Sequence, residues 1–99
     1  MSEIVYYTPE RIDTNNSGEI LREMEAFLDE AIAEGDDGIY YAVDMTDTGY
    51  LSSAGLRSLT QMQKRLRAAR GTFVLRNVSE SVRDLLDVTG LSGYLPIEE

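Results

Sequence analysis

The chain has 99 residues, 42% of them hydrophobic and 27% charged, which suits one soluble domain with one core. It contains no His and no Cys, which excludes disulfides, thiolate metal sites and a Ser–His–acid catalytic triad. The net charge of −9 argues against nucleic acid or anionic lipid as the main partner, because their phosphates would be repelled. No apolar run reaches the roughly 20 residues that span a bilayer and no signal peptide is visible, so we expect a cytoplasmic protein without membrane insertion.

The charge is unevenly distributed along the chain. Residues 1–50 carry 13 acidic and 2 basic side chains, a net charge of −11, whereas residues 51–99 carry 5 acidic and 7 basic side chains, a net charge of +2. The second half could therefore present a locally basic surface, although solvated helix faces without any partner explain the same pattern.

The start of the chain predicts a strand, a loop and a helix. Residues 4–8 (IVYYT) are β-branched and aromatic and predict a strand, which Pro9 ends. Residues 10–16 are polar and predict a loop, and Asn16 followed by Glu19 resembles a capping box at the start of an amphipathic helix. The apolar side chains of this helix recur at helical spacing, namely Ile20, Leu21, Met24, Leu28, Ala31 and Ile32.

The middle of the chain predicts a buried strand and a second helix. Gly35 ends the first helix, and residues 39–43 (IYYAV) are almost continuously apolar, as expected of a strand covered on both faces. Residues 44–52 are polar and predict a loop. A second helix is expected over about residues 53–70, where Gly71 stops it. Its inward side chains are Leu56, Leu59, Met62, Leu66 and Ala69.

The end of the chain predicts a third buried strand, a short helix and an edge strand. Residues 72–75 (TFVL) form the strand, and Ser79 caps the helix, which ends at Gly90. Residues 94–97 predict a short last strand, which Pro96 confines to the edge of the sheet.

Strands and helices thus alternate in the order β-α-β-α-β-α-β. This order predicts one α/β domain over residues 1–99 with right-handed crossovers and a largely parallel or mixed sheet. In such sheets, sites gather in the loops beyond the carboxyl ends of the strands. Here those loops are residues 9–16, 44–52 and 76–78, and the first two contain most of the candidate functional residues.

Two adjacent serines, Ser52 and Ser53, stand where a loop opens into the second helix. One of them is expected to be the N-cap, whose hydroxyl accepts a hydrogen bond from a free amide of the first turn. A phosphate at a helix N-terminus would meet free backbone amides and the positive end of the helix dipole. It would also add about −1.5 to −2 charges to the surface. The position is therefore suited to a phosphorylation switch as well as to a plain cap.

One face of the second helix carries Ser53, Arg57, Gln61 and Lys64 at positions i, i+4, i+8 and i+11. This face is either a solvated surface or a docking surface with the serine at its top. Tyr50, just before the serines, is expected to be exposed beside them, whereas the other tyrosines are expected to pack in or beside the sheet.

Asp44 and Asp47 follow the central strand and allow two chemical hypotheses, a Mg²⁺ site or a phospho-acceptor aspartate as in response-regulator receivers. The receiver hypothesis lacks its supporting residues, because Asp36 and Asp37 precede a strand and the only lysine, Lys64, lies in mid-helix. Loop capping and solvation explain these acids more simply, and no glycine pattern of a nucleotide loop is present. We therefore expect no metal, no cofactor and no catalytic residues.

Three segments of the chain together resemble one known family. Residues 44–57 (DMTDTGYLSSAGLR) are similar to a signature of a strand, Asp or Asn, a short loop, an aromatic or apolar pair and D/S-S-x-G-L. Residues 70–75 and 82–91 are similar to its glycine–strand–helix–Gly-Leu ending, and residues 11–13 are a weaker match to its G-x-L-D. The segments cover most of residues 4–97. The family is the STAS domain of the anti-sigma factor antagonists.

The resemblance implies a STAS domain shortened at both ends, with helices mainly on one side of the sheet and no enzymatic activity. In the family, the serine corresponding to Ser53 is phosphorylated by an ATP-binding anti-sigma factor serine kinase. The unphosphorylated form binds that kinase and releases the sigma factor. Ser52, where family members often carry an acid, is the second choice of acceptor. The residues expected to contact the partner are Asp13, Asp44, Asp47, Tyr50, Ser52, Ser53, Arg57, Gln61 and Lys64.

Several alternatives stay open at this point. The chain could be a constitutive STAS adaptor subunit, in a stress-signalling complex or a lipid-transport system, that is never phosphorylated. It could also be an enzyme such as a metal-dependent phosphatase. A sheet edge left open by the shortened ends could be covered by a partner or a second copy, so we expect a monomer or a weak homodimer.

Overall fold

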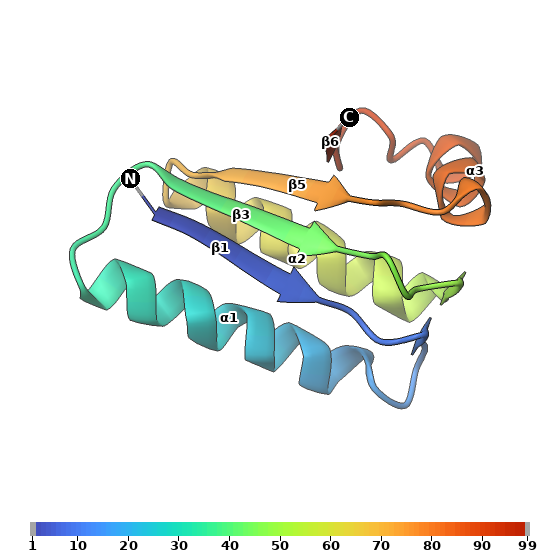
Figure 1. Cartoon of the computed structure of the whole chain (residues 1–99), viewed down its shortest axis with the longest axis horizontal. Coiled ribbons are helices and arrows are strands. Elements are labelled where there is room, and N and C mark those ends of the chain that lie inside the picture. Colours follow the sequence, from blue (N-terminus) through green and yellow to red (C-terminus); the bar gives the residue numbers. More distant parts are fainter. Residues whose placement is uncertain (1, 99) are drawn as a thin grey trace.

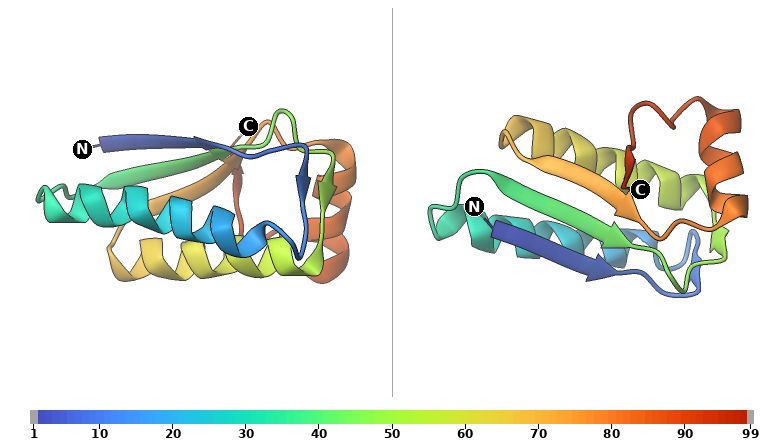
Figure 2. Two further views of the ribbon diagram at one scale, coloured as in Figure 1. Left: turned by 90° about the horizontal axis from the view of Figure 1, so that it is seen from below. Right: turned by 45° about the horizontal axis from the view of Figure 1, so that its top comes forward.

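Four parallel strands form the main sheet in the computed structural model of the protein, which describes residues 2–98. Helices α1 and α2 lie side by side on one face of this sheet, and α3 lies beyond the carboxyl ends of the strands (Figures 1 and 2). This arrangement confirms the predicted α/β fold with a parallel sheet. In sheet order the strands are β1 (Ser2–Tyr7), β3 (Ile39–Asp44), β5 (Thr72–Arg76) and β6 (Ile97–Glu98), and the helices are α1 (Ser17–Ala33), α2 (Ser53–Ala68) and α3 (Glu80–Thr89).

The hydrophobic core lies between the sheet and the two long helices. Tyr41 of β3 is fully buried, packs against Phe73 of β5 with 5.9 Å between ring centroids, and donates a hydrogen bond of 2.8 Å to the Met24 carbonyl oxygen of α1. Burying aromatic side chains of this size supplies much of the driving force for joining sheet and helices. No helix within residues 2–98 has the length and hydropathy needed to cross a bilayer.

Two short strands that the sequence did not predict form a second, separate sheet. Strand β2 (Arg11–Ile12) pairs in parallel with β4 (Tyr50–Leu51), so that Arg11 lies opposite Tyr50 and Ile12 opposite Leu51. Runs of two residues are too short to show the alternation that marks a strand. Their pairing brings the two candidate functional loops into direct contact.

The predicted caps of α3 are confirmed, whereas the predicted capping hydrogen bonds at the start of α1 are not formed. Ser79 caps α3 by accepting a hydrogen bond of 3.2 Å from the Val82 amide, and Gly90 ends it in the left-handed conformation with φ 77°. The predicted capping box at Asn16 is wrong. Asn16 occupies the N-cap position of α1, but its amide oxygen accepts from the Asp13 amide at 2.8 Å instead of from the helix.

The last strand, β6 (Ile97–Glu98), overlaps the predicted strand 94–97 only at Ile97, and it lies at the edge of the sheet, as expected. Pro96 precedes it, and the Pro96 carbonyl oxygen accepts a hydrogen bond of 2.9 Å from the Leu75 amide. Because proline has no amide hydrogen to donate, it can stand beside β5 only through its carbonyl group.

Candidate functional site

The pairing of β2 with β4 brings the residues of the candidate site together at the N-terminus of α2. The Ser52 amide donates a hydrogen bond of 2.9 Å to the Ile12 carbonyl oxygen, which extends the parallel pairing up to the first turn of the helix. Asp13 follows Ile12 directly, so it lies beside the two serines although about 40 residues of chain separate them. The sequence predicted these residues on two loops, and this pairing explains how the loops meet.

The two serines at this point have different environments. Ser52 has extended backbone angles and its hydroxyl accepts a hydrogen bond of 3.1 Å from the Gly55 amide, so it is the N-cap of α2. Ser53 is the first residue of the helix and is exposed. Its hydroxyl makes no hydrogen bond with any residue in the part of the chain that the structure describes. Ser53 is therefore the serine whose oxygen is available to a second protein.

Gly55 allows the helix to begin this close to the small sheet. A Cβ atom at this position would lie 2.5 Å from Leu51 Cδ1 and 2.8 Å from Ile12 Cγ2, both closer than real contacts allow. Both neighbours are buried, since Ile12 is only 1% exposed and Leu51 only 6% exposed, so neither can move aside freely. The glycine therefore determines how closely the first turn of α2, which contains Ser53, packs against the β2–β4 pair.

Asp44, one of the residues expected to contact the partner, is buried and faces inward. Its carboxylate accepts hydrogen bonds from the Thr46 amide at 3.0 Å, from the Thr46 hydroxyl and from the Asn77 side chain at 3.1 Å. Burial by itself raises the pKa of Asp44, but these hydrogen bonds and the nearby Arg76 hold that pKa below its usual value. Asp44 therefore fastens the loop after β3 to the loop after β5, and its contact with a partner stays a prediction.

A pair of buried threonines fixes the same loop from the other side. Thr48 is 1% exposed, and its hydroxyl donates a hydrogen bond of 2.6 Å to the Pro9 carbonyl oxygen. The Thr8 hydroxyl lies within hydrogen-bond distance of the Thr48 hydroxyl and 3.3 Å from the Asp44 carbonyl oxygen. The sequence did not single out either threonine. Their contacts hold the loop that leads to Ser53 against the end of β1.

Arg11 lies in the candidate site, although the sequence did not single it out as a contact residue. Its guanidinium lies over the ring of Tyr50, 4.3 Å from the ring centroid, and 3.7 Å from the Asp13 carboxylate. Tyr50 is 46% exposed, as predicted, so the pair forms part of the surface beside the serines. Stacking on an aromatic face holds an arginine in place while its outer edge stays free for hydrogen bonds. Only the β2–β4 pairing reveals this contact.

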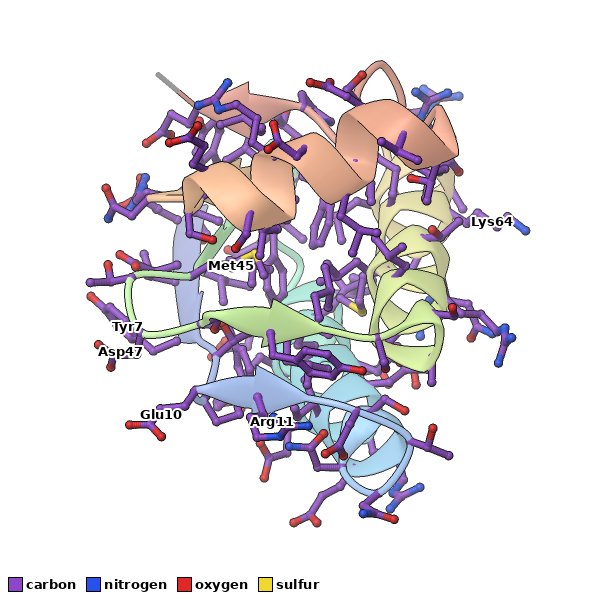
Figure 3. All side chains as sticks on the ribbon, turned by 90° about the vertical axis from the view of Figure 1, so that its right-hand side faces the viewer. Tyr7, Glu10, Arg11, Met45, Asp47 and Lys64 are labelled. Atoms are coloured by element: carbon purple, nitrogen blue, oxygen red, sulfur yellow. The ribbon has the colours of Figure 1, made fainter. Side chains whose placement is uncertain are left out.

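The remaining predicted residues fall into two groups. Arg57, Gln61 and Lys64 are exposed on α2, and Lys64 points away from the body of the protein (Figure 3). Asp47 projects from the opposite side of the molecule (Figure 3) and lines a cleft of about 490 Å³ together with Tyr7. The nine residues predicted to contact a partner are therefore not one continuous surface. No group of three acidic side chains within residues 2–98 is arranged to hold a metal ion.

Comparisons with known proteins agree with this fold. Residues 2–99 match the family model of the STAS domain. The chain is 29% identical over 75 residues to BtrV of Bordetella bronchiseptica, whose name describes it as an anti-sigma factor antagonist, and the match covers 76% of this chain and 63% of that protein. It is 32% identical over 62 residues to the anti-sigma-B factor antagonist of Listeria monocytogenes, covering 63% of this chain and 54% of that protein.

The chain therefore spans between about half and two thirds of the length of these relatives. The family model, in contrast, matches nearly all of it, and the resemblance noted in the three sequence segments is confirmed. The chain has a parallel sheet with two helices on one face, and a glycine lets α2 begin close to the small sheet. It belongs to the STAS-domain family.

Proposed function

We propose that the protein is a cytoplasmic anti-sigma factor antagonist that binds an anti-sigma factor kinase and loses this binding when Ser53 is phosphorylated. The observation that carries the proposal is the free hydroxyl of Ser53 at the exposed start of α2, next to a serine that already caps the helix. The two relatives named as antagonists support the same role.

The start of α2 suits a phosphoserine chemically. The amides of the first turn and the positive end of the helix dipole favour a negative group at this point. In the reaction, the Ser53 hydroxyl oxygen attacks the γ-phosphorus of ATP, ADP leaves, and the hydroxyl proton passes to a base of the kinase. The kinase supplies the nucleotide, the metal and the base, so the proposal assigns no catalytic step to this chain.

The surface around Ser53 suits docking of a second protein before phosphorylation. Tyr50 offers an exposed aromatic ring beside the serine, and Arg11 lies over that ring. Side chains of these types are common at the centres of interfaces. A phosphate placed in such an interface adds volume and about two negative charges, and desolvating it without a partner costs several kcal/mol. Phosphorylation is therefore expected to weaken binding strongly.

Phosphorylation itself is tested with candidate anti-sigma factor kinases, chosen among any that are encoded near this gene. Each purified kinase is incubated with the protein and ATP, and intact-mass spectrometry measures the addition of one phosphoryl group. Ser53→Ala is expected to abolish the addition, and Ser52→Ala is expected to retain it. Transfer that depends on Ser52 instead would move the switch to that residue. No transfer by any of these kinases would favour a constitutive STAS adaptor.

Binding is tested separately by isothermal titration calorimetry with the kinase that transfers the phosphate. Ser53→Ala is expected to bind whether or not ATP is present, because it cannot be modified. Ser53→Asp is expected to bind far more weakly, since it places a negative charge at the same point. Equal affinity of the two variants would reject the switch.

A further inference from the structure

The helices of the protein differ sharply in charge. Helix α2 contains four basic residues and no acidic residue, a net charge of +4, in a chain whose total is −9. Helix α1 contains five acidic residues and one basic residue, a net charge of −4. The two helices lie side by side on the same face of the sheet (Figure 2). The exposed side of α2 is therefore a basic strip on a protein that is acidic overall.

Two of the four cations of α2 are already engaged within the protein. Arg65 pairs with Glu25 of α1 at 3.2 Å and also with Asp29. Arg67 lies over the ring of Tyr94, 4.7 Å from its centroid. These contacts hold α2 against its neighbours.

The other two cations, Arg57 and Lys64, form no ion pair or hydrogen bond with any of residues 2–98. Both are exposed, and with Ser53 they follow the spacing i, i+4 and i+11 along one side of the helix. At about 1.5 Å of rise per residue this side is roughly 17 Å long from Ser53 to Lys64. A groove of about 320 Å³ lies alongside its far end and is lined by Gln61, Lys64, Arg65, Ala68 and Glu25.

We propose that this strip, which we call the α2 cationic face (Ser53, Arg57, Gln61 and Lys64), binds a complementary acidic surface of the partner kinase, and that phosphate on Ser53 blocks binding by taking Arg57 for itself. The inference rests on the proposed function and adds the chemistry of the partner surface and the reason for the switch.

Charge complementarity favours an acidic protein surface as the occupant. An acidic partner is repelled by most of a molecule with net charge −9, so the unpaired cations of α2 fix where it docks and in which orientation. Arg57 is one turn from Ser53, which is the distance at which an arginine pairs with a negative group on the same helix. A phosphoserine at residue 53 therefore replaces the partner's carboxylate with an intramolecular phosphate.

Binding of the unphosphorylated protein to the kinase that modifies Ser53 tests the docking face. Arg57→Gln and Lys64→Gln are each expected to lower affinity about three- to tenfold at about 50 mM NaCl, and less at about 300 mM because salt screens exposed charges. Arg70→Gln is the matched control. It removes the same charge from an exposed arginine beyond the end of α2 and should bind like the wild type. Wild-type affinity of both variants, or an equal loss in the control, would overturn the docking face.

Competition for Arg57 is tested without any partner. Phosphoserine is placed at residue 53 by genetic code expansion, and phosphorus NMR follows its second ionisation, which ordinarily has a pKa of about 6. We expect this pKa to be lower in the wild type than in Arg57→Gln, because the guanidinium stabilises the dianion. An unchanged pKa would overturn the competition.

The two proposals fail in different ways. If Ser53→Asp and Ser53→Ala differ in kinase binding while Arg57→Gln and Lys64→Gln bind like the wild type, the switch stands and the cationic face is rejected. If competition is correct, Ser53→Asp should cost less additional affinity in an Arg57→Gln background than in the wild type, because the two changes act on one contact. Fully additive losses would reject the competition.

Discussion

At the scale of single residues, backbone geometry gives two identical side chains different roles. Ser52 has extended backbone angles and turns its hydroxyl back to the Gly55 amide, whereas Ser53 is already helical and presents its hydroxyl outward. The sequence predicted that one of the two serines caps the helix. It could not say which, because capping residues are identified by position and a helix boundary read from sequence is uncertain by more than one residue.

This assignment predicts unequal effects on stability. Ser52→Ala should lower the free energy of unfolding by about 1 kcal/mol, the usual cost of losing an N-cap. Ser53→Ala should change it by less than about 0.5 kcal/mol, as for other exposed positions. Urea denaturation of both variants measures the difference. A loss in Ser53→Ala as large as that in Ser52→Ala would contradict the assignment.

Asp44 predicts a pH dependence. Asp44→Asn should lower the free energy of unfolding at neutral pH by about 1–3 kcal/mol, because hydrogen bonds to a charged acceptor are lost. The native pKa lies below the unfolded one, so the ionised carboxylate stabilises the fold above about pH 4, and this contribution is lost as pH falls through the native pKa. Denaturation between about pH 7 and pH 2 should show the difference between wild type and variant shrinking. A constant difference would exclude a charge effect.

At the scale of elements, the long helices and strands could be predicted, and the short ones could not. Ile20, Met24 and Leu28 have helical spacing and are buried in α1 as expected. Strands β2 and β4, in contrast, exist only because they pair with each other and pack under α2. Two residues in each strand are too few to show a local pattern, and Ile12 and Leu51 lie against a glycine that is distant from Ile12 in the sequence. The contact between the two candidate loops was therefore not visible in the sequence.

Gly55 provides the test at this scale. Alanine has the higher helix propensity, yet Gly55→Ala should destabilise the protein by about 1–3 kcal/mol, because its Cβ would overlap Leu51 and Ile12. Gly18→Ala in α1 is the matched control, since the nearest atom to its Cβ would be 3.6 Å away, at the flexible end of Arg22. That change should be neutral or stabilise by up to about 1 kcal/mol. Thermal unfolding of both variants measures this difference in stability. Similar changes in stability in the two variants would exclude the packing argument.

At the scale of the whole molecule, an open sheet edge with exposed aromatic side chains lies on a protein of high negative charge. The outer edge of β1 has no neighbouring strand within residues 2–98, and beside it Tyr7 is 70% and Phe27 50% exposed. The sequence predicted the excess of acid in the first half and an open sheet edge. It did not predict that Asp47 and Lys64 project from opposite sides of the molecule (Figure 3). The directions of these two side chains depend on the three-dimensional path of the chain through its loops.

The negative net charge and the open sheet edge together predict that self-association depends on pH. At neutral pH the net charge of −9 keeps copies of the chain apart, and near the isoelectric point of about 4.3 that repulsion disappears. Sedimentation velocity should therefore show monomers at neutral pH and reversible association near the isoelectric point. Phe27→Lys should reduce this association, since it places a charge beside the open edge. An unchanged sedimentation coefficient over this pH range would contradict the prediction.

The buried threonine pair has a consequence for the enzyme that would modify Ser53. A kinase that accepts extended peptides pulls its target residue into an active-site groove, but Thr8 and Thr48 anchor the segment before this serine to the end of β1. The enzyme must then recognise a folded surface of the protein, because the target serine is already part of a helix. A short synthetic peptide around Ser53 would be a poor substrate, and a conservative change at Thr48, remote from the acceptor, would slow the modification.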